Sequence, residues 1–278
     1  MAQLIATFTD EIKTVLATEL QKLDSVSLRL EKFTFLGDNS KLQQINATCT
    51  KAARQKFPPT SLASTLTNKQ NRSKQFILTL GGRMIVNHAG GILENAGLCL
   101  HRFFNYPMIP GSALKGIALH YAVHMWRNKL ASPEDIVHIF GYPTNIRDFD
   151  ATFCLDTNKR SDFSQAGNIS FMQAIPADTN WRLVADVLTP HGENDYTNPV
   201  TNFFIAVEKE AKFSFTLFKL TKATDNDLNM AESFLRGALC ENGVGAKTAA
   251  GYGWFTGQDS IENSVKLKLI TPGFFGGA

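Results

Sequence analysis

Two short segments combine glycine with lysine, and residues of these types can bind phosphate groups. In the first, residues 109–116 (IPGSALKG), Pro110 and Gly111 form a turn before a helix that we expect to begin near Ser112. The first N–H groups of a helix lack internal partners and carry partial positive charge, so a phosphate could be held there together with Lys115. An ordinary capped helix with a surface lysine explains the same residues, and the local sequence alone favours that interpretation.

The second segment, residues 243–253 (GVGAKTAAGYG), has four glycines in eleven residues and is followed by an aromatic strand. Glycines let a backbone approach a partner closely, and Lys247 and Thr248 add a cation and a hydroxyl group. Ala246 stands where a nucleotide-binding P-loop needs glycine before lysine, so that motif is excluded. Tyr252 could stack on a base or be buried in the core, and the whole segment could simply connect a helix to a strand.

The histidines are candidates for metal binding and for acid–base chemistry. His120 and His124 stand four residues apart on one predicted helix, but the glutamate of a HExxH zinc motif is absent. We therefore expect neither a metal nor another cofactor. His88 and His191 lie in polar loops, where they could act as acid and base in RNA cleavage or only contact phosphate or solvent.

The uneven distribution of charge points to a polyanionic partner. Residues 39–133 hold twelve Lys and Arg and one acid, Glu94, whereas residues 1–38 have a net charge of −2 and residues 134–278 a net charge of −6. Clustered positive charge attracts phosphate backbones, which release counterions on binding. The fold could instead place the acidic segments beside the basic one and cancel its field, but we favour a nucleic-acid partner.

The composition excludes several classes of protein. The chain has 278 residues, of which 44% are hydrophobic and 19% are charged, which is a globular composition with enough apolar side chains for a sizeable core. No stretch approaches the roughly 20 apolar residues that cross a bilayer, and acids interrupt the N-terminal apolar pattern where a secretory signal has none. The four cysteines are far apart, which argues against a disulfide framework. We expect a cytoplasmic protein with reduced thiols and no membrane partner.

The N-terminal part of the chain is expected to contain a helix, a strand and a connector. Residues 10–23 have the apolar spacing of an amphipathic helix, and residues 27–36 are typical of an extended strand. Residues 37–75 are polar and basic, so we expect a loop-rich connector. A strand over residues 76–86 is interrupted by two glycines, Gly81 and Gly82, which suggest a bulge or the close approach of another backbone.

The rest of the chain mixes helices and strands. Helical spacing and capping residues predict helices over residues 112–129, from Ser132 onward and over residues 225–241, the last ending at Gly243. Alternating or apolar runs predict strands over residues 168–174, 182–188, 203–207 and 212–220, and a final strand follows the glycine-rich segment. Strict βαβ alternation is absent, so the predicted class is α+β.

Taken in their order along the chain, the motifs resemble the RAMP superfamily of CRISPR-associated proteins. The resemblance covers roughly residues 26–257 and rests on the IPGSALKG helix start, a TPH loop at residues 189–191 and the GVGAKTAAGYG loop. More narrowly, the chain is similar to the sixth-subunit family of the type III-B (Cmr) effector complex. The resemblance implies a ferredoxin-like (RRM-like) sheet with helical and loop insertions and a C-terminal glycine-rich loop. We expect one RAMP domain over residues 1–278, with residues 1–75 as an N-terminal extension and residues 76–278 as the core.

The resemblance also implies a function and a set of partners. The expected function is that of a non-catalytic structural subunit in antiviral defence, which holds the 3′ portion of the crRNA and the guide–target duplex. Its partners would be crRNA, target RNA, the backbone RAMP subunit, the small helical subunit and a neighbouring end-capping RAMP subunit. The alternative is a metal-independent RAMP endoribonuclease that processes crRNA or cuts target RNA.

Thirteen residues are the candidates for RNA contact, and no catalytic residue is expected. They come from the basic segment, the TPH loop and the glycine-rich loop: Arg83, His88, Arg102, Gly111, Ser112, Lys115, His191, Gly243, Gly245, Lys247, Thr248, Gly251 and Tyr252. Contacts from glycine backbones and lysines would read the shape and charge of the RNA, and binding would then be largely independent of guide sequence.

Overall fold

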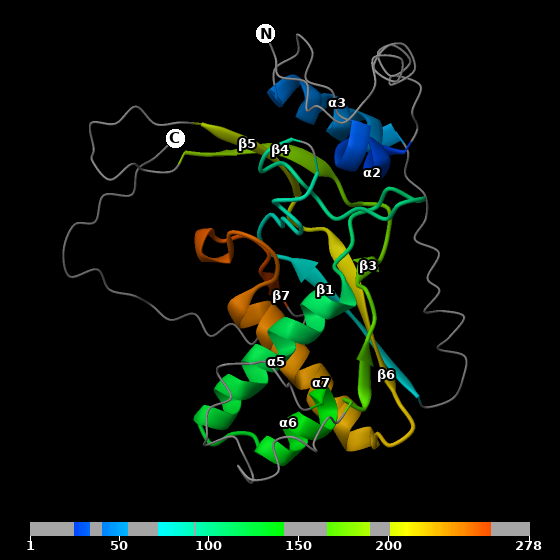
Figure 1. The fold of residues 1–278 in the computed structure, drawn as a ribbon, viewed down its shortest axis with the longest axis vertical. Helices are drawn as coiled ribbons and strands as arrows, with labels where there is room; N and C mark the ends of the chain where they lie inside the picture. The colour runs from blue at the N-terminus through cyan, green and yellow to red at the C-terminus, as the bar shows by residue number, and fades with distance from the viewer. Residues whose placement is uncertain are drawn as a thin grey trace, which may run out of the picture.

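The structure is a computed structural model that describes residues 25–33, 41–54, 72–91, 93–141, 166–189 and 201–256 (Figure 1). The helical elements are α2 (Val26–Leu28), the π-helical η2 (Arg29–Phe33), α3 (Lys41–Arg54), α5 (Gly111–Arg127), α6 (Pro133–Phe140), α7 (Asp225–Gly237), the π-helical η4 (Ala238–Asn242) and the 3₁₀ turn η5 (Thr248–Ala250). The strands are β1 (Ser73–Leu80), β2 (Ile169–Phe171), β3 (Ile175–Pro176), β4 (Leu183–Leu188), β5 (Asn202–Val207), β6 (Lys212–Lys219) and β7 (Phe255–Thr256). The order of these elements confirms the α+β class.

The main sheet is antiparallel and is built around β1 and β6. Its strand order is β2-β6-β1-β7, and β3 also pairs with β6. On its buried face Phe76 lies opposite Phe215 with the two rings stacked at 5.3 Å, and Leu78 lies opposite Phe213. These residues alternate with more polar ones along each strand, which gives the sheet one face that packs against the helices.

Three helices gather on one side of the main sheet, in the lower part of Figure 1. The predicted apolar face of α5 is buried at Leu114, Ala118 and Ala122, and α5 crosses α7 beside the sheet. α6 begins at the Ser132 cap, whose side chain accepts a hydrogen bond from the Asp135 backbone N–H. The helices predicted over residues 112–129 and from Ser132 are thus confirmed. Periodicity sufficed here because each helix buries one apolar face.

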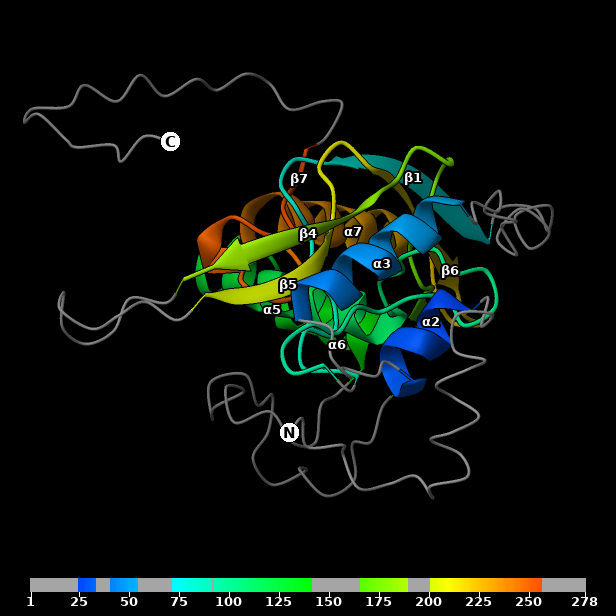
Figure 2. The same cartoon turned by 90° about the horizontal axis from the view of Figure 1, so that it is seen from above.

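A separate hairpin of β4 and β5 lies at the other end of the molecule. Its six residue pairs run from Leu183 opposite Val207 to Leu188 opposite Asn202. α3 lies alongside this hairpin, as Figures 1 and 2 both show. The segment after β1, residues 81–86, joins the main sheet to this hairpin, because Met84 exchanges two backbone hydrogen bonds with Val207 of β5.

The structure corrects two predictions in the N-terminal part. Residues 26–33 are helical and not extended: the Ser25 side chain caps α2, and Val26 and Leu30 lie one turn apart in the core. Residues 41–54 form the 14-residue helix α3 inside the segment predicted as a loop-rich connector. Its few apolar residues share one face, and packing of that face outweighs the polar composition. The helix predicted over residues 10–23 lies outside the described residues.

The glycine pair after β1 marks a close approach between two backbones. β1 ends at Leu80, earlier than predicted, and a Cβ atom on Gly82 would lie 2.4 Å from the carbonyl oxygen of Gly251. The prediction of a close approach at this pair is therefore confirmed. Over the described ranges, no helix has both the length and the apolar character needed to cross a bilayer.

Candidate nucleic-acid interface

The glycine-rich loop, residues 243–253, follows α7 and η4 and is fixed to the segment after β1. Gly243 has φ +72° and ends the helix, as predicted. The Ala246 N–H donates to the Ile85 carbonyl at 2.8 Å, and the Gly253 N–H donates to the Arg83 carbonyl at 2.7 Å. The Val244 N–H donates to the Gly253 carbonyl at 2.9 Å and closes the base of the loop. The loop is therefore a rigid part of the fold.

Two glycines of the loop have backbones that exclude a side chain. Gly245 has φ +96°, and a Cβ atom on it would lie 2.1 Å from the Ile85 carbonyl oxygen. Gly253 has φ +73°, and its added Cβ would lie 1.9 Å from the Val244 carbonyl oxygen. Glycine tolerates these positive φ values, and the two residues allow the loop to pack directly on the neighbouring backbone.

The tip of the loop presents Lys247 from a left-handed backbone, with φ +61° and ψ +31°. The Ala250 N–H donates to the Lys247 carbonyl at 2.9 Å, and the indole N–H of Trp254 donates to the Thr248 carbonyl at 2.8 Å. A lysine in this conformation costs about 1 kcal/mol relative to glycine. The surrounding hydrogen bonds hold the tip in this shape.

Lys247 and His88 meet at the ring of Phe204, on β5. The Lys247 Nζ lies 5.5 Å from the centroid of this ring, and the His88 and Phe204 rings form a T-shaped pair with centroids 5.4 Å apart. Burial lowers the pKa of His88, and the charges of Lys247 and Lys41 lower it further. Two of the residues predicted to contact RNA, from segments far apart in the chain, are therefore neighbours.

Lys41 of α3 completes this group. Its Nζ donates to Oδ1 of Asn202, at the start of β5, at 2.8 Å. Burial lowers the pKa of Lys41, and the nearby carboxylate of Glu94 acts in the opposite direction. We call Lys41, His88, Lys247 and Phe204 the Phe204 cluster. Sequence reasoning missed Lys41 because α3 was not predicted, although its place in the basic segment was a usable signal.

Arg83 and Tyr252 share one carboxylate beneath the loop. Asp186 of β4 pairs with a terminal guanidinium nitrogen of Arg83 at 2.9 Å and accepts a hydrogen bond from the Tyr252 hydroxyl at 2.6 Å. Arg83 also pairs with Glu208 at 3.3 Å. Tyr252 is only 9% exposed, so of the two alternatives for this ring, base stacking and burial in the core, the structure shows burial. The loop lacks acids in its own sequence, yet the fold brings Asp186 to it.

The first turn of α5 holds three more of the predicted residues. Pro110 occupies the N-cap and supplies no side-chain hydrogen bond to the helix. A Cβ on Gly111 would lie 2.1 Å from the Phe171 carbonyl oxygen, so this glycine lets the helix start against β2. Ser112 is exposed and Lys115 is half-buried. Packing of α5 on β2 places Lys115, whereas packing of the glycine-rich loop on the segment after β1 places Lys247. That one RNA strand passes both lysines stays a prediction.

The remaining candidates differ in their surroundings. Arg102 is exposed in a turn, and its carbonyl group accepts a hydrogen bond from the Ser25 hydroxyl at 3.3 Å. Thr248 is half-buried and Gly251 is exposed, with open space around the position of an added Cβ. His191 lies outside the described residues. No group of three or more His, Cys, Asp and Glu side chains suited to a metal ion occurs in the part of the chain that the structure describes.

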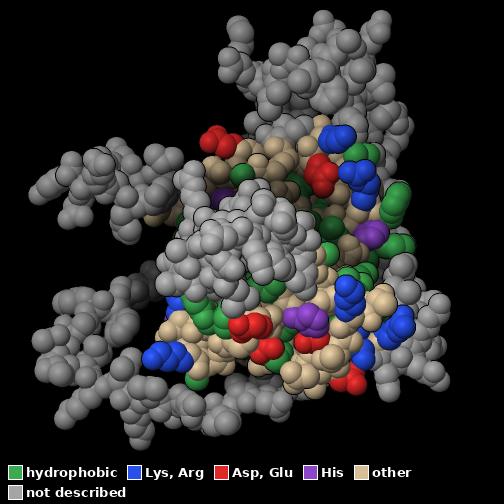
Figure 3. Space-filling model, turned by 60° about the horizontal axis from the view of Figure 1, so that its bottom comes forward, with side chains coloured by type: hydrophobic (Ala, Val, Ile, Leu, Met, Phe, Trp, Pro, Cys, Tyr) green, Lys and Arg blue, Asp and Glu red, His purple; other side chains and the backbone are tan. Residues whose placement is uncertain are grey.

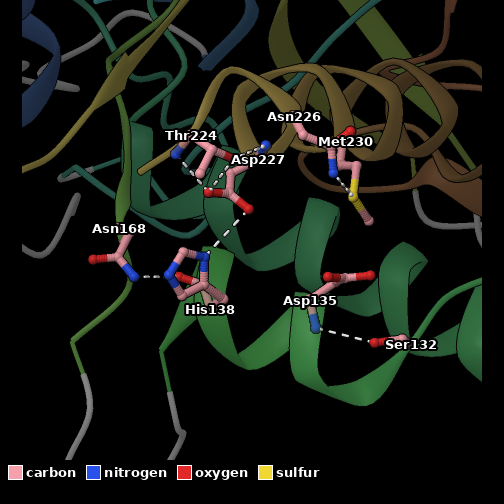
Figure 4. Close-up of polar contacts among 8 residues, drawn as sticks. All are labelled: Ser132, Asp135, His138, Asn168, Thr224, Asn226, Asp227 and Met230. Carbon is pink, nitrogen blue, oxygen red and sulfur yellow. Dashed lines mark hydrogen bonds and ion pairs between the residues drawn. The ribbon is translucent and has the colours of Figure 1, made fainter. Parts of the chain in front are cut away.

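A histidine–aspartate pair lies elsewhere in the molecule and connects two helices (Figure 4). The His138 Nδ1 lies 3.2 Å from Oδ1 of Asp227, while Oδ2 of Asp227 accepts hydrogen bonds from the backbone and hydroxyl of Thr224. The bond from the Thr224 backbone and the reciprocal bond of 3.2 Å from the Asp227 N–H to the Thr224 hydroxyl form the capping box of α7. Asp227 and Gly243 are separated by an almost continuous helical segment about 24 Å long. The pair therefore belongs to the α6–α7 packing and lies apart from the Phe204 cluster.

The face seen from below carries charges of both signs. In Figure 3, acidic and basic side chains are mixed over the described part of that face, with no single-sign patch. A surface of mixed sign attracts a polyanion weakly. Among the described residues, Lys41 and Lys247 of the Phe204 cluster are two cations that both lie near His88.

The comparisons with known proteins agree with this fold. The family model described as RAMP superfamily matches residues 77–256. This chain belongs to the RAMP superfamily, and its fold is the ferredoxin-like α+β fold of that family, with helical and loop insertions. No curated protein matches the sequence significantly.

Several solved structures are similar to the chain. A chain of the type III-B Cmr-beta complex bound to cognate target RNA, solved by cryo-EM, has 16% sequence identity and a TM-score of 0.52, with 88% of this chain and 87% of that chain covered. Cmr6 from Pyrococcus furiosus has 23% identity and a TM-score of 0.38, with 66% and 97% covered. Oligomeric Cmr4 from Pyrococcus furiosus has 12% identity and a TM-score of 0.38, with 66% and 96% covered. The first of these shows a shared fold over most of both chains.

Proposed function

We propose that this protein is a non-catalytic RNA-binding subunit of a type III-B CRISPR effector complex in the cytoplasm. One observation supports it above the others: a rigid glycine-rich loop carries Lys247 to the ring of Phe204, where it meets His88, and the charges of Lys247 and Lys41 both act on His88. Fixed cations beside a close-packed backbone suit a sugar–phosphate chain, which is recognised by shape and charge. Membership of the RAMP superfamily and the shared fold with a chain from a target-bound complex support the same assignment.

The finer role that we propose is assembly at the crRNA 3′ portion and along the guide–target duplex. The backbone RAMP subunit, the small helical subunit and a neighbouring end-capping RAMP subunit would be its protein partners. Sequence-independent contact suits this role because the guide sequence differs between complexes while the RNA backbone does not.

Binding of single-stranded RNA by the full chain tests the proposal. Lys247→Glu and Lys41→Glu should each weaken binding about tenfold or more at low salt, and the loss should shrink as salt rises. Lys209→Glu is a matched control, because Lys209 is exposed just beyond the opposite end of β5 and should change binding little. Equal binding by all three variants and the wild type at low salt would reject the Phe204 cluster as the RNA site.

The alternative function is that of a metal-independent endoribonuclease, and one feature of His88 favours it. Its Nδ1 is buried without a hydrogen-bond partner among the described residues, and burial lowers its pKa, so the ring is neutral near pH 7. A neutral histidine could accept a proton from an RNA 2′-hydroxyl group. Incubation with repeat RNA and with guide–target duplex distinguishes the two functions. Site-specific cuts that are lost in His88→Ala or His191→Ala would show an enzyme.

A further inference from the structure

Phe103 is the most exposed large hydrophobic side chain among the described residues. It is 79% exposed, at the tip of a turn formed by residues 101–106, beside the exposed Arg102. Single exposed apolar side chains are common on soluble proteins, so exposure alone identifies nothing. The turn, however, is held rigidly from both sides.

The ring of His101 fixes the backbone of this turn. Its Nδ1 accepts hydrogen bonds from the backbone N–H groups of Phe103 at 3.3 Å and Phe104 at 3.2 Å. Nδ1 must be unprotonated to accept them, and burial lowers the pKa of His101 in the direction that this requires. The Asn105 N–H donates to the His101 carbonyl at 2.8 Å, and Asn105 has φ +58°. The tip therefore has one defined shape.

The turn is also attached to α2 at two points. The Asn105 Oδ1 accepts the Ser27 N–H at 3.2 Å, and the Ser25 hydroxyl donates to the Arg102 carbonyl at 3.3 Å. Below the tip, the rings of Phe104 and Tyr106 stack with centroids 5.9 Å apart. Phe103 is thus presented outward on a preorganised support, which lowers the entropy that a partner must overcome.

We propose that Phe103 is a stacking platform for one unpaired base of a bound RNA strand, with Arg102 contacting the adjacent phosphate. This proposal deepens the proposed RNA-binding function and depends on it. The charge of the surrounding chain favours RNA over a protein partner: from Asn95 to Pro133, 39 consecutive residues contain no Asp or Glu. An aromatic face beside a guanidinium group matches a base and its phosphate, and such stacking tolerates any base.

Binding of a single-stranded RNA of mixed sequence, and of an abasic RNA of equal length, to the full chain tests this proposal. Phe103→Ala should weaken binding of the base-containing RNA about fivefold to a hundredfold and leave the slope of affinity against salt unchanged, because stacking neutralises no phosphate. Binding of the abasic RNA should not change. Arg102→Ala should reduce the slope by about 1. In Phe103→Trp, base-containing RNA should quench the fluorescence of the new indole more than abasic RNA does.

Leu130→Ala is the matched control, since Leu130 is 72% exposed and lies outside the turn. Its RNA binding should equal that of the wild type. Phe103→Ala and Leu130→Ala should both keep the wild-type melting temperature. Wild-type RNA affinity in Phe103→Ala, together with lost affinity in Lys247→Glu, would overturn the stacking proposal and leave the proposed function standing. If the wild type itself does not bind RNA, the proposed function is overturned. Unchanged RNA affinity in Phe103→Ala with failure to join other complex subunits would show a protein contact and overturn the stacking proposal.

Discussion

The hydroxyl group of Tyr252 donates a hydrogen bond of 2.6 Å to Asp186, a residue of β4 that lies 66 positions earlier in the chain. The other oxygen of this carboxylate pairs with Arg83. Burial raises the pKa of Tyr252 to about 12, and the hydrogen bond to Asp186 acts in the same direction. One carboxylate therefore joins the glycine-rich loop, the β4–β5 hairpin and the segment after β1.

Tyr252→Phe removes the hydroxyl group and keeps the ring against Phe204. We expect the free energy of unfolding to fall by about 1 kcal/mol, because a partly buried hydrogen bond is lost while the carboxylate keeps its pair with Arg83. Urea denaturation of Tyr252→Phe, Asp186→Asn and the double variant measures the coupling between the two residues. Strictly additive losses would mean that the hydroxyl and the carboxylate do not interact in solution.

Gly245→Val should prevent the loop from packing and impair assembly into a complex. The new Cβ would lie 2.1 Å from the Ile85 carbonyl oxygen at φ +96°, so we expect a loss of about 3 kcal/mol or more in stability. Gly251→Ala separates the two causes, since Gly251 has φ +88° but open space around its Cβ position. That variant should lose only about 1 kcal/mol. Chemical denaturation of both variants gives the comparison, and similar small losses would contradict the packing argument.

Asp227 makes stability depend on pH in the acid range. Burial alone would raise its pKa, but hydrogen bonds from Thr224 and His138 outweigh burial and hold the pKa below its usual value. A carboxylate with a depressed pKa stabilises the fold above its unfolded pKa of about 3.9, and this contribution is lost as pH falls through the folded value.

We therefore expect Asp227→Asn to be about 1–2 kcal/mol less stable than the wild type at pH 7, with the difference shrinking below about pH 4. Asp225→Asn is the control on the same helical turn, because the Asp225 side chain is 80% exposed in its pair with Lys219. Denaturation curves between pH 7 and pH 3 test this. A difference for Asp227→Asn that does not change with pH would remove ionisation as its cause.

Lysine footprinting tests whether Lys115 and Lys247 contact the same RNA. Bound phosphate should protect Lys41, Lys115 and Lys247 from acylation, while Lys209 keeps its reactivity. Lys115→Glu should also weaken RNA retention, with a loss that shrinks at high salt. Protection of Lys247 alone would show that the start of α5 lies off the RNA path.

The sequence predicted the elements whose side chains repeat with a clear period. α5, α6 and α7 bury one apolar face each, and β6 alternates Phe213 and Phe215 with Ser214 and Thr216. The strand predicted over residues 27–36 is wrong at residues 27–33, where Leu28 and Leu30 alternate with charged residues as they would in a strand. Here the packing of Val26 and Leu30 favours a helix, and such tertiary contacts cannot be seen in a local pattern.

The candidate site was predictable in its parts but not in its arrangement. Glycine and lysine content pointed to the loop. The neighbours of the loop did not: Lys41 comes from a helix that was not predicted, and Asp186, which occupies Arg83 and Tyr252, lies far away in sequence. Long-range pairings of this kind depend on the whole topology.

The left-handed backbone of Lys247 affects two properties in opposite directions: it lowers the stability of the free chain, and it presents the cation of the proposed RNA site. Glycine at this position would relieve the strain, so Lys247→Gly should melt at a higher temperature than the wild type while it binds RNA less tightly. Lys129 and Glu210 also have positive φ, so strain alone does not mark a binding site. A Lys247→Gly chain that is more stable and binds RNA less tightly would show that the lysine at this loop tip serves the proposed ligand.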